Sequence, residues 1–213
     1  MLHEEGYQFG SRKFKLFTFS RLMGKMLFDP QKGFTFFPPL SFIIASPKID
    51  ILESLAQYLV KKREFYLGEN KIWTESIEVM MEKKPTEKVN VEMLSPIVAY
   101  STLYTQDGRK KTYYYNPWEK DFAEIIRENL IKKYTLINGS LPNSVEFHIV
   151  PLGVKKNHEK ILIYKETVIH GWMGRYELAG NPGLIQTGYD AGLGSKNAQG
   201  FGCFEFIEER RCE

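Results

Sequence analysis

Two stretches of the chain space their apolar side chains with the period of an α-helix. They lie in residues 47–63 and 116–134, where apolar residues recur three and four positions apart and so share one helical face. The apolar positions are Leu52, Leu55, Ala56 and Leu59 in the first stretch and Trp118, Phe122, Ile125, Ile126 and Leu130 in the second. Asn116 and Pro117 open the second stretch with residue types that favour a helix start. Each pattern therefore predicts a helix.

The other apolar runs are rich in aromatic and β-branched residues, a composition typical of strands. A third, shorter helix is expected to begin at Asn181-Pro182 and to end at Gly192. Strands or extended runs are expected in residues 14–22, 34–44, 65–81, 89–104, 145–150, 160–178 and 201–207.

A polar stretch that contains Pro85 divides these elements into two groups. After it the order is strand, helix, strand, strand, helix, strand, which is that of a ferredoxin-like unit. Before it the order is only strand, strand, helix, strand, the same unit without its first strand and helix. The sequence therefore predicts an α+β protein of tandem ferredoxin-like domains. An incomplete N-terminal domain is expected in residues 1–82, a linker in residues 83–88 and a C-terminal domain in residues 89–213.

The incomplete order has a consequence for the N-terminal sheet. In a ferredoxin-like sheet the first strand lies between the last strand and the third. Without it, the run at residues 65–81 has no neighbour within the chain, and a bare interior edge promotes aggregation. We therefore expect that residues upstream of Met1, or something else, supply the missing strand.

The amino-acid composition is that of an ordinary folded protein and does not identify a function. The 213 residues are 43% hydrophobic and carry a net charge of +3, which permits an anionic partner without requiring one. Basic residues come in scattered groups, such as Lys132 and Lys133, that are typical of solvated faces. No run of about eighteen apolar residues predicts a membrane span, and the N-terminus has no secretory signal. Cys203 and Cys212 lack metal-ligand spacing, so we expect reduced thiols, no bound metal or cofactor and a cytoplasmic location.

Residues 192–202 read GLGSKNAQGFG, with four glycines in eleven positions. Glycine lets another molecule approach the backbone, and successive N–H groups can form a nest that binds an anion. The glycine spacing excludes both the Walker A loop and the dinucleotide-binding fingerprint. A helix C-cap followed by a turn would use the same glycines, so these residues alone leave both explanations open.

Two tandem ferredoxin-like units that end in a loop of the form G-x-G-x5-G-x-G form a specific combination. It resembles the RAMP superfamily of CRISPR systems, and within it the Cas6 family of CRISPR-associated endoribonucleases. The likeness covers nearly the whole chain, and its strongest part is GYDAGLGSKNAQGFGCFEF in residues 188–206. Other matching stretches are LHEEGY, FKLFTFSRL, MLSPI, EKDFAEIIRENLIKKY and GRYELAGNP.

The resemblance implies a function and a partner. Members of this family cut precursor CRISPR RNA within its repeats without a metal ion. The ribose 2′-OH attacks the adjacent phosphorus, which leaves a 2′,3′-cyclic phosphate and a 5′-hydroxyl. The implied partner is CRISPR repeat RNA or crRNA in the prokaryotic cytoplasm, with a homodimer or a CRISPR effector complex left open. A non-catalytic RAMP subunit that binds crRNA without cutting it is the alternative, and an unrelated ferredoxin-like interaction module is a third.

The same resemblance implies roles for particular residues. His3 matches the family's catalytic histidine and Lys15 its catalytic lysine, whose charge would steady the phosphorane or the leaving oxygen. A frayed terminal histidine and an ordinary exposed strand lysine are the alternatives. The loop is expected to grip RNA, and not to cut it, through its amides and two side chains. The RNA-binding residues are Gly192, Gly194, Lys196, Asn197, Gly200 and Gly202.

Family members begin earlier in the fold, with a strand and a helix that often carries a catalytic tyrosine. Met1 falls just before the matching histidine, so the resemblance implies an N-terminally truncated member. Tyr7 follows His3 instead of preceding it, and the tyrosine's role is therefore not transferred. His148 lies on an apolar strand, where a structural role is expected, and contact of His170 with RNA is the less favoured interpretation of that residue.

Overall fold

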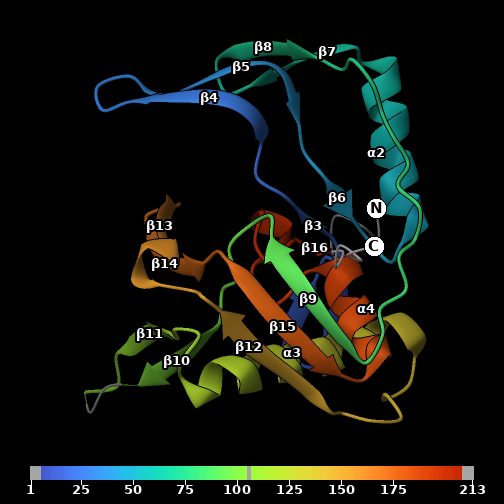
Figure 1. Ribbon diagram of the computed structural model, residues 1–213, viewed down its shortest axis with the longest axis vertical. Helices are drawn as coiled ribbons and strands as arrows, with labels where there is room; N and C mark the ends of the chain where they lie inside the picture. Colours follow the sequence, from blue (N-terminus) through green and yellow to red (C-terminus); the bar gives the residue numbers. More distant parts are fainter. Residues whose placement is uncertain (1–5, 105–106, 208–213) are drawn as a thin grey trace, which may run out of the picture.

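A four-stranded antiparallel sheet forms the centre of the C-terminal half in the computed structural model of this chain, which describes residues 6–104 and 107–207 (Figure 1). Along the chain, the first strand of this sheet is followed by a helix, two strands, a second helix and the last strand. The elements are β9 (Lys88–Met93), α3 (Lys120–Asn138), β12 (Phe147–Leu152), β15 (Arg175–Gly180), α4 (Pro182–Ala191) and β16 (Phe204–Phe206). In space the strand order is β12, β15, β9, β16, so the first strand lies between the third and the last. The ferredoxin-like arrangement predicted for this half is therefore confirmed.

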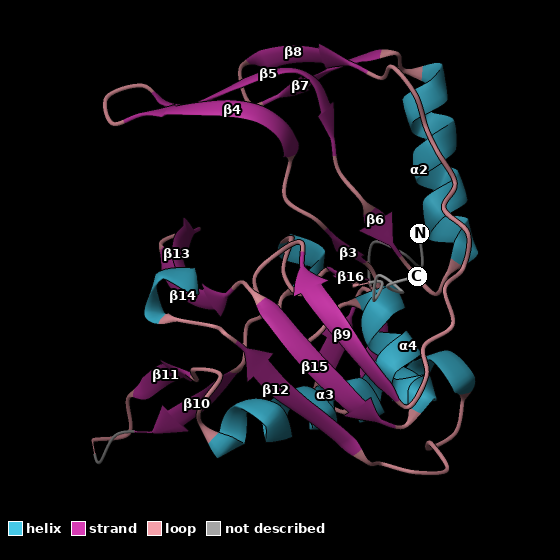
Figure 2. Ribbon diagram, in the orientation of Figure 1, coloured by secondary structure: helices cyan, strands magenta, loops and turns pink. Residues whose placement is uncertain are grey.

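Helices α3 and α4 cover one face of this sheet (Figure 2). Alternate strand residues face the helices, because successive side chains of a strand point to opposite faces. The shared core includes the strand residues Val91, Met93, Phe147, Ile149, Tyr176, Leu178 and Phe204 and the helix residues Phe122, Ile126, Leu130, Leu184 and Ile185. The predicted apolar face of the second helix is confirmed at Phe122, Ile126 and Leu130. Trp118 lies before the helix and is 54% exposed.

Two hairpins are inserted into the C-terminal half. One is formed by β10 (Tyr100–Tyr104) and β11 (Lys110–Tyr114), and the other by β13 (Glu159–Tyr164) and β14 (Thr167–Trp172). A short 3₁₀ helix, η1 (Lys156–His158), precedes the second hairpin. The extended run expected at residues 160–178 is thus three strands, β13, β14 and β15, because the chain reverses direction twice within it.

From residue 6 onward, the N-terminal half contains the helix α2 (Ile49–Lys61) and short antiparallel strand pairs. The pairs are β1 (Tyr7–Phe9) with β2 (Arg12–Phe14), β3 (Thr18–Phe19) with β6 (Ile44–Ala45), β4 (Met23–Asp29) with β5 (Gly33–Ser41), and β7 (Glu64–Leu67) with β8 (Asn70–Trp73). Within the described residues these pairs do not join into one sheet. The sequence pattern did not predict β4, and within the run expected at residues 65–81 only β7 and β8 are strands.

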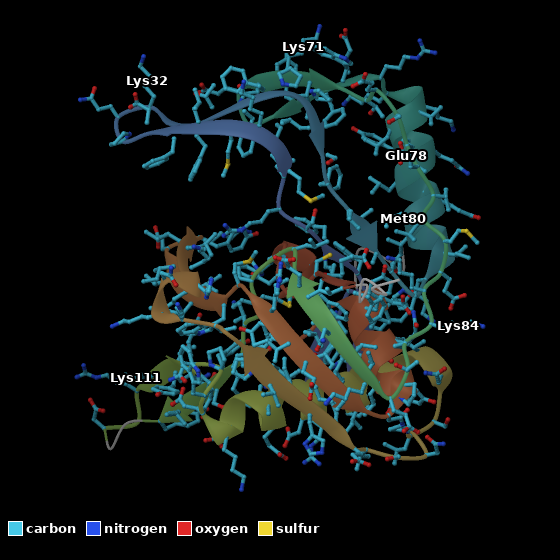
Figure 3. All side chains as sticks on the ribbon, in the orientation of Figure 1. Lys32, Lys71, Glu78, Met80, Lys84 and Lys111 are labelled. Atoms are coloured by element: carbon cyan, nitrogen blue, oxygen red, sulfur yellow. The ribbon has the colours of Figure 1, made fainter. Side chains whose placement is uncertain are left out.

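The hairpin of β4 and β5 projects away from the C-terminal sheet, with Lys32 at its tip, and α2 stands to one side (Figure 3). Met26, Phe28 and Phe34 of this hairpin are each more than half exposed, and no residue of α2 is fully buried. The predicted apolar face of α2 is therefore only partly covered. The domain boundary at residues 83–88 stays a prediction. No helix in residues 6–104 or 107–207 is long and apolar enough to cross a membrane.

Candidate functional site

The glycine-rich loop, residues 192–202, joins α4 to β16 and folds back against the segment that follows β9. The amides of Leu193, Ser195 and Gly202 donate hydrogen bonds to the carbonyls of Gly202, Val98 and Pro96 at 2.8, 2.8 and 2.9 Å. Gly200 also uses its amide, on the carbonyl of Asn197 at 3.0 Å. The expectation that the glycines present a row of bare amides is therefore wrong for Gly200 and Gly202, because protein carbonyls already occupy these donors.

The glycines serve close packing. Gly202 has φ of +79°, and a Cβ at this position would lie 2.0 Å from the carbonyl oxygen of Leu193. Gly194 has φ of +66°, and a Cβ there would lie 2.5 Å from the carbonyl oxygen of Val98. Neither position admits a side chain, in conformation or in space. The loop is glycine-rich because it crosses its own backbone and that of residues 96–98 at short range.

Lys133 of α3 is the residue that holds the loop in this shape. Its side chain is 1% exposed, and its Nζ donates to the carbonyl oxygens of Gly192 at 2.6 Å, Gly194 at 3.1 Å and Ala191 at 3.3 Å. A fourth acceptor is Oδ1 of Asn197 at 2.7 Å. Burial lowers the pKa of Lys133 to about 7, whereas the four oxygens favour the charged form because they accept its hydrogen bonds. The prediction that Lys133 lies on a solvated face is wrong.

Asn197 extends this network across the loop. Its Oδ1 accepts from Lys133, and its Nδ2 donates to the carbonyls of Leu193 and Phe201 at 3.0 Å each. The side chain thereby ties the start of the loop to its end. Its expected contact with RNA is not supported by this geometry, because these bonds use both Nδ2 hydrogens and engage Oδ1.

The loop also joins the two halves of the molecule. Thr18 of β3 is fully buried and donates from Oγ1 to the carbonyl of Phe201 at 3.0 Å. The ring of Phe19 lies so close to Gly200 that a Cβ on that glycine would stand 2.7 Å from it. The loop is therefore packed between β3 of the N-terminal half and the segment after β9.

Lys196 is the loop residue whose charge remains near the surface. Its backbone is left-handed, with φ of 63°, and its Nζ lies 5.4 Å from the centre of the Tyr100 ring. Partial burial lowers its pKa. Within the described part of the chain, no hydrogen bond engages the amides of Lys196, Asn197 and Ala198. These three amides have no protein acceptor among the described residues, and the residues that carry them, like the Lys196 side chain, are only partly buried.

Of the two expected catalytic residues, the structure describes Lys15. His3 lies outside the described residues. Lys15 is exposed and directly follows β2. In the hairpin of β1 and β2, Tyr7 pairs with Phe14, and a Cβ on Gly6 would lie 3.6 Å from Cγ of Lys15. Gly6 and Lys15 are therefore neighbours at the open end of this hairpin.

The cysteines and the possible metal ligands were the other candidates for chemistry. Burial raises the pKa of Cys203 to about 12, which makes its thiol unreactive at neutral pH. Cys212 lies outside the described residues. Over residues 6–104 and 107–207, the side chains of His, Cys, Asp and Glu form no group of three or more that could hold a metal ion.

Sequence reasoning missed Lys133 although a signal was present. Ile126 and Leu130 belong to the buried stripe of α3, and Lys133 continues that stripe at the seventh position after Ile126. A lysine in an apolar stripe needs an acceptor in the core, because an isolated buried charge is strongly unfavourable. This spacing could have identified it as a structural cation.

Comparisons with known proteins agree with one another. The family description "CRISPR associated protein Cas6, C-terminal" matches residues 53–206. The chain is 31% identical to the CRISPR-associated endoribonuclease Cas6 of Pyrococcus furiosus over 193 residues, which are 88% of this chain and 69% of that protein.

Solved structures show the same likeness. The structure of a Cas6-related gene product from Pyrococcus furiosus matches with a TM-score of 0.84 and 26% identity, over 92% of this chain and 79% of that one. A RAMP protein binding different RNA substrates matches with a TM-score of 0.82 and 27% identity, over 91% of this chain and 80% of that one. The predicted α+β fold of tandem ferredoxin-like domains is thereby confirmed.

The role of Lys133 can be measured by replacing it with methionine, which keeps the length of the side chain and removes the ammonium. We expect Lys133→Met to lower the free energy of unfolding by about 2–4 kcal/mol, because several buried oxygens lose their donor. Lys132→Met is the matched control, since this neighbour on α3 makes only a surface pair with Glu128 at 3.2 Å, and its loss should cost less than about 1 kcal/mol. Urea unfolding compares the two variants. Equal midpoints would show that the buried network does not stabilise the fold.

Proposed function

The chain belongs to the Cas6 family of CRISPR-associated proteins, and from that premise we propose that it is an endoribonuclease that cleaves CRISPR repeat RNA. The observation that carries this proposal is the family match over residues 53–206 together with a relative, 31% identical, that is a CRISPR-associated endoribonuclease. The net charge of +3 suits an anionic partner without being large enough to identify one.

The proposed chemistry uses the RNA as its own nucleophile. The 2′-hydroxyl loses its proton and attacks the adjacent phosphorus, and the bond to the 5′-oxygen breaks. The leaving oxygen then takes up a proton. The products are a 2′,3′-cyclic phosphate and a 5′-hydroxyl, and the step balances without a metal ion or a cofactor. It requires a proton acceptor, a proton donor and positive charge at the phosphate.

His3 and Lys15 are the residues that we propose for these roles. An imidazole can accept or give a proton near neutral pH, and a lysine ammonium can stabilise the charge on the phosphorane or the leaving oxygen. Gly6 neighbours Lys15 in the hairpin of β1 and β2. His3 is three residues before Gly6 in the sequence. We propose that His3 and Lys15 act on the same phosphate.

The loop of residues 192–202 is proposed to hold the RNA and not to cut it. Lys196 and the neighbouring amides of Asn197 and Ala198 would contact phosphate oxygens. The glycines Gly192, Gly194, Gly200 and Gly202 would act indirectly, because their small size lets the loop take the shape in which Lys196 is presented. Association with a second copy of the chain or with an effector complex stays a prediction.

A second candidate function is RNA binding without cleavage. It is favoured by the structural likeness, at a TM-score of 0.82, to a RAMP protein binding different RNA substrates. In that case the chain would hold crRNA through the same loop. The two functions differ in one observable, the appearance of a cut strand.

Cleavage is tested by incubating the protein with an end-labelled CRISPR repeat RNA from the same genome in the presence of EDTA. We expect one discrete cut that ends in a cyclic phosphate. His3→Ala should slow it at least about 100-fold, because a positioned acid–base group contributes that much or more. Lys13→Ala, which changes an exposed lysine of β2, is the control and should cut at the normal rate. Tight binding with no cut in the unmodified protein would exclude the nuclease and favour the second function.

The contact of Lys196 with phosphate is tested by the salt dependence of RNA binding. For single-stranded RNA, each phosphate contact adds about 0.7 to the slope of log K against log salt concentration, because counterions are released. Lys196→Ala should weaken binding and lower the slope by about that amount. Lys62→Ala is the control, since Lys62 likewise lies over a tyrosine, 5.6 Å from the ring of Tyr58, but on the other half of the molecule. An unchanged slope for Lys196→Ala would rule out a phosphate contact there.

A further inference from the structure

A row of aromatic rings leads away from the glycine-rich loop. Tyr100 and Tyr114 lie directly across from each other on β10 and β11, with ring centres 5.7 Å apart. The ring of Tyr114 lies 5.5 Å from the imidazole of His170 on β14. At the other end, the ammonium of Lys196 is 5.4 Å from the centre of the Tyr100 ring. We call Lys196, Tyr100, Tyr114 and His170 the aromatic row.

The tyrosines of the aromatic row pack against buried side chains. Val98, Ile169 and Phe201 form a separate buried cluster, and the two tyrosines pack against it. All four members of the row are only partly buried. The rings are therefore held in place before any ligand arrives, which lowers the entropic cost of binding one.

His170 is held by a carboxylate. Its Nδ1 lies 2.7 Å from Oε1 of Glu159, which is on the partner strand β13 of the same hairpin. This contact fixes the plane of the imidazole beside Tyr114. The hairpin of β13 and β14 thus supplies the last ring of the row, and the hairpin of β10 and β11 supplies the other two.

The row continues along the hairpin of β10 and β11. Every second residue of a strand faces the same side, so the side that carries Tyr100 and Tyr114 also carries Tyr104 and Lys110, which lie opposite each other. Tyr104 is 68% exposed. Lys111 extends outward from the neighbouring position of β11 (Figure 3). The tyrosines on this side of the hairpin thus have a lysine near each end, Lys196 beside Tyr100 and Lys110 opposite Tyr104.

We propose that the aromatic row is a binding site for unpaired nucleotides of RNA, with bases stacked on Tyr100 and Tyr114 and phosphates near Lys196 and Lys110. Aromatic rings interleaved with cations are the chemistry that binds single strands. A duplex does not fit this description, because its bases are already stacked on each other. The site lies beside the loop proposed to hold the substrate. The inference therefore rests on the proposed function and extends it to the form of RNA that is bound.

The test compares a single-stranded oligonucleotide of the repeat, labelled with 2-aminopurine, with a duplex of the same sequence. The unmodified protein should prefer the single strand and quench the fluorophore, because stacking quenches it. Tyr100→Leu and Tyr114→Leu should each weaken binding about tenfold, since one stacked base contributes on that scale, and the quenching should be lost. Tyr100→Phe and Tyr114→Phe should bind within about twofold of normal, because the ring remains. Normal affinity and quenching in both leucine variants would overturn the proposal.

Two controls keep the test decisive. Tyr58→Leu removes an exposed tyrosine of α2 that also lies under a lysine, and it should bind RNA normally. Tyr100 and Tyr114 touch buried residues, so a leucine variant could fail to fold. In that case the unmodified protein is photocrosslinked to RNA that contains 4-thiouridine. Crosslinks should map to residues 100–104, 107–114 and 167–172, and crosslinks confined to other segments would contradict the proposed site.

The proposed cleavage and the proposed stacking site can be disproved independently of each other. If the protein cuts repeat RNA and the leucine variants bind it normally, the aromatic row is not the site, and the proposed nuclease stands. If the protein binds single strands through the row and cuts nothing, the site stands and the nuclease function fails.

Discussion

One buried ammonium group determines the shape of the glycine-rich loop. The Nζ of Lys133 has three hydrogens and four oxygen acceptors within 3.3 Å, of which three are carbonyls at the end of α4 and the start of the loop. A charge with no access to water is tolerated only with such partners. Several backbone groups must therefore stay in place for the charge to remain satisfied, and the loop becomes part of the core of the C-terminal half.

Because Lys133 holds the loop against the core, the glycines have a packing role. A glycine-rich loop can expose its amides to an anion or can pack them against its own fold, and this loop mostly packs them. Glycine allows the backbone of residue Gly202 to pack directly against that of Leu193. The side chain of Asn197 donates hydrogen bonds to carbonyls at both ends of the loop. The surface left for RNA is consequently small at the loop itself, around Lys196. The neighbouring hairpins, with Tyr100 and Tyr114, provide the further area that a polynucleotide would need.

Local patterns predicted local structure well and long-range contacts poorly. The period of α3 located Ile126 and Leu130 in the core, and the order of elements predicted the strand order of the C-terminal sheet. The contact between Lys133 and Asn197 joins residues 64 positions apart, which no helical or strand period can report. The same limit explains why Asn197 looked like a ligand-binding residue, since its partners exist only in the folded chain. For His3 and Lys15, the resemblance to a family and not any physical pattern suggested the roles.

The most direct test of this account is amide hydrogen exchange in the loop, measured for the free protein and for its complex with RNA. We expect slow exchange at Leu193, Ser195 and Gly202 in the free protein, with little change when RNA binds. We expect fast exchange at Lys196 and Ala198 in the free protein, and slower exchange in the complex. Fast exchange at Leu193, Ser195 and Gly202 that RNA suppresses would contradict this account, because the loop would then be the open nest of bare amides and Lys133 would not be its anchor.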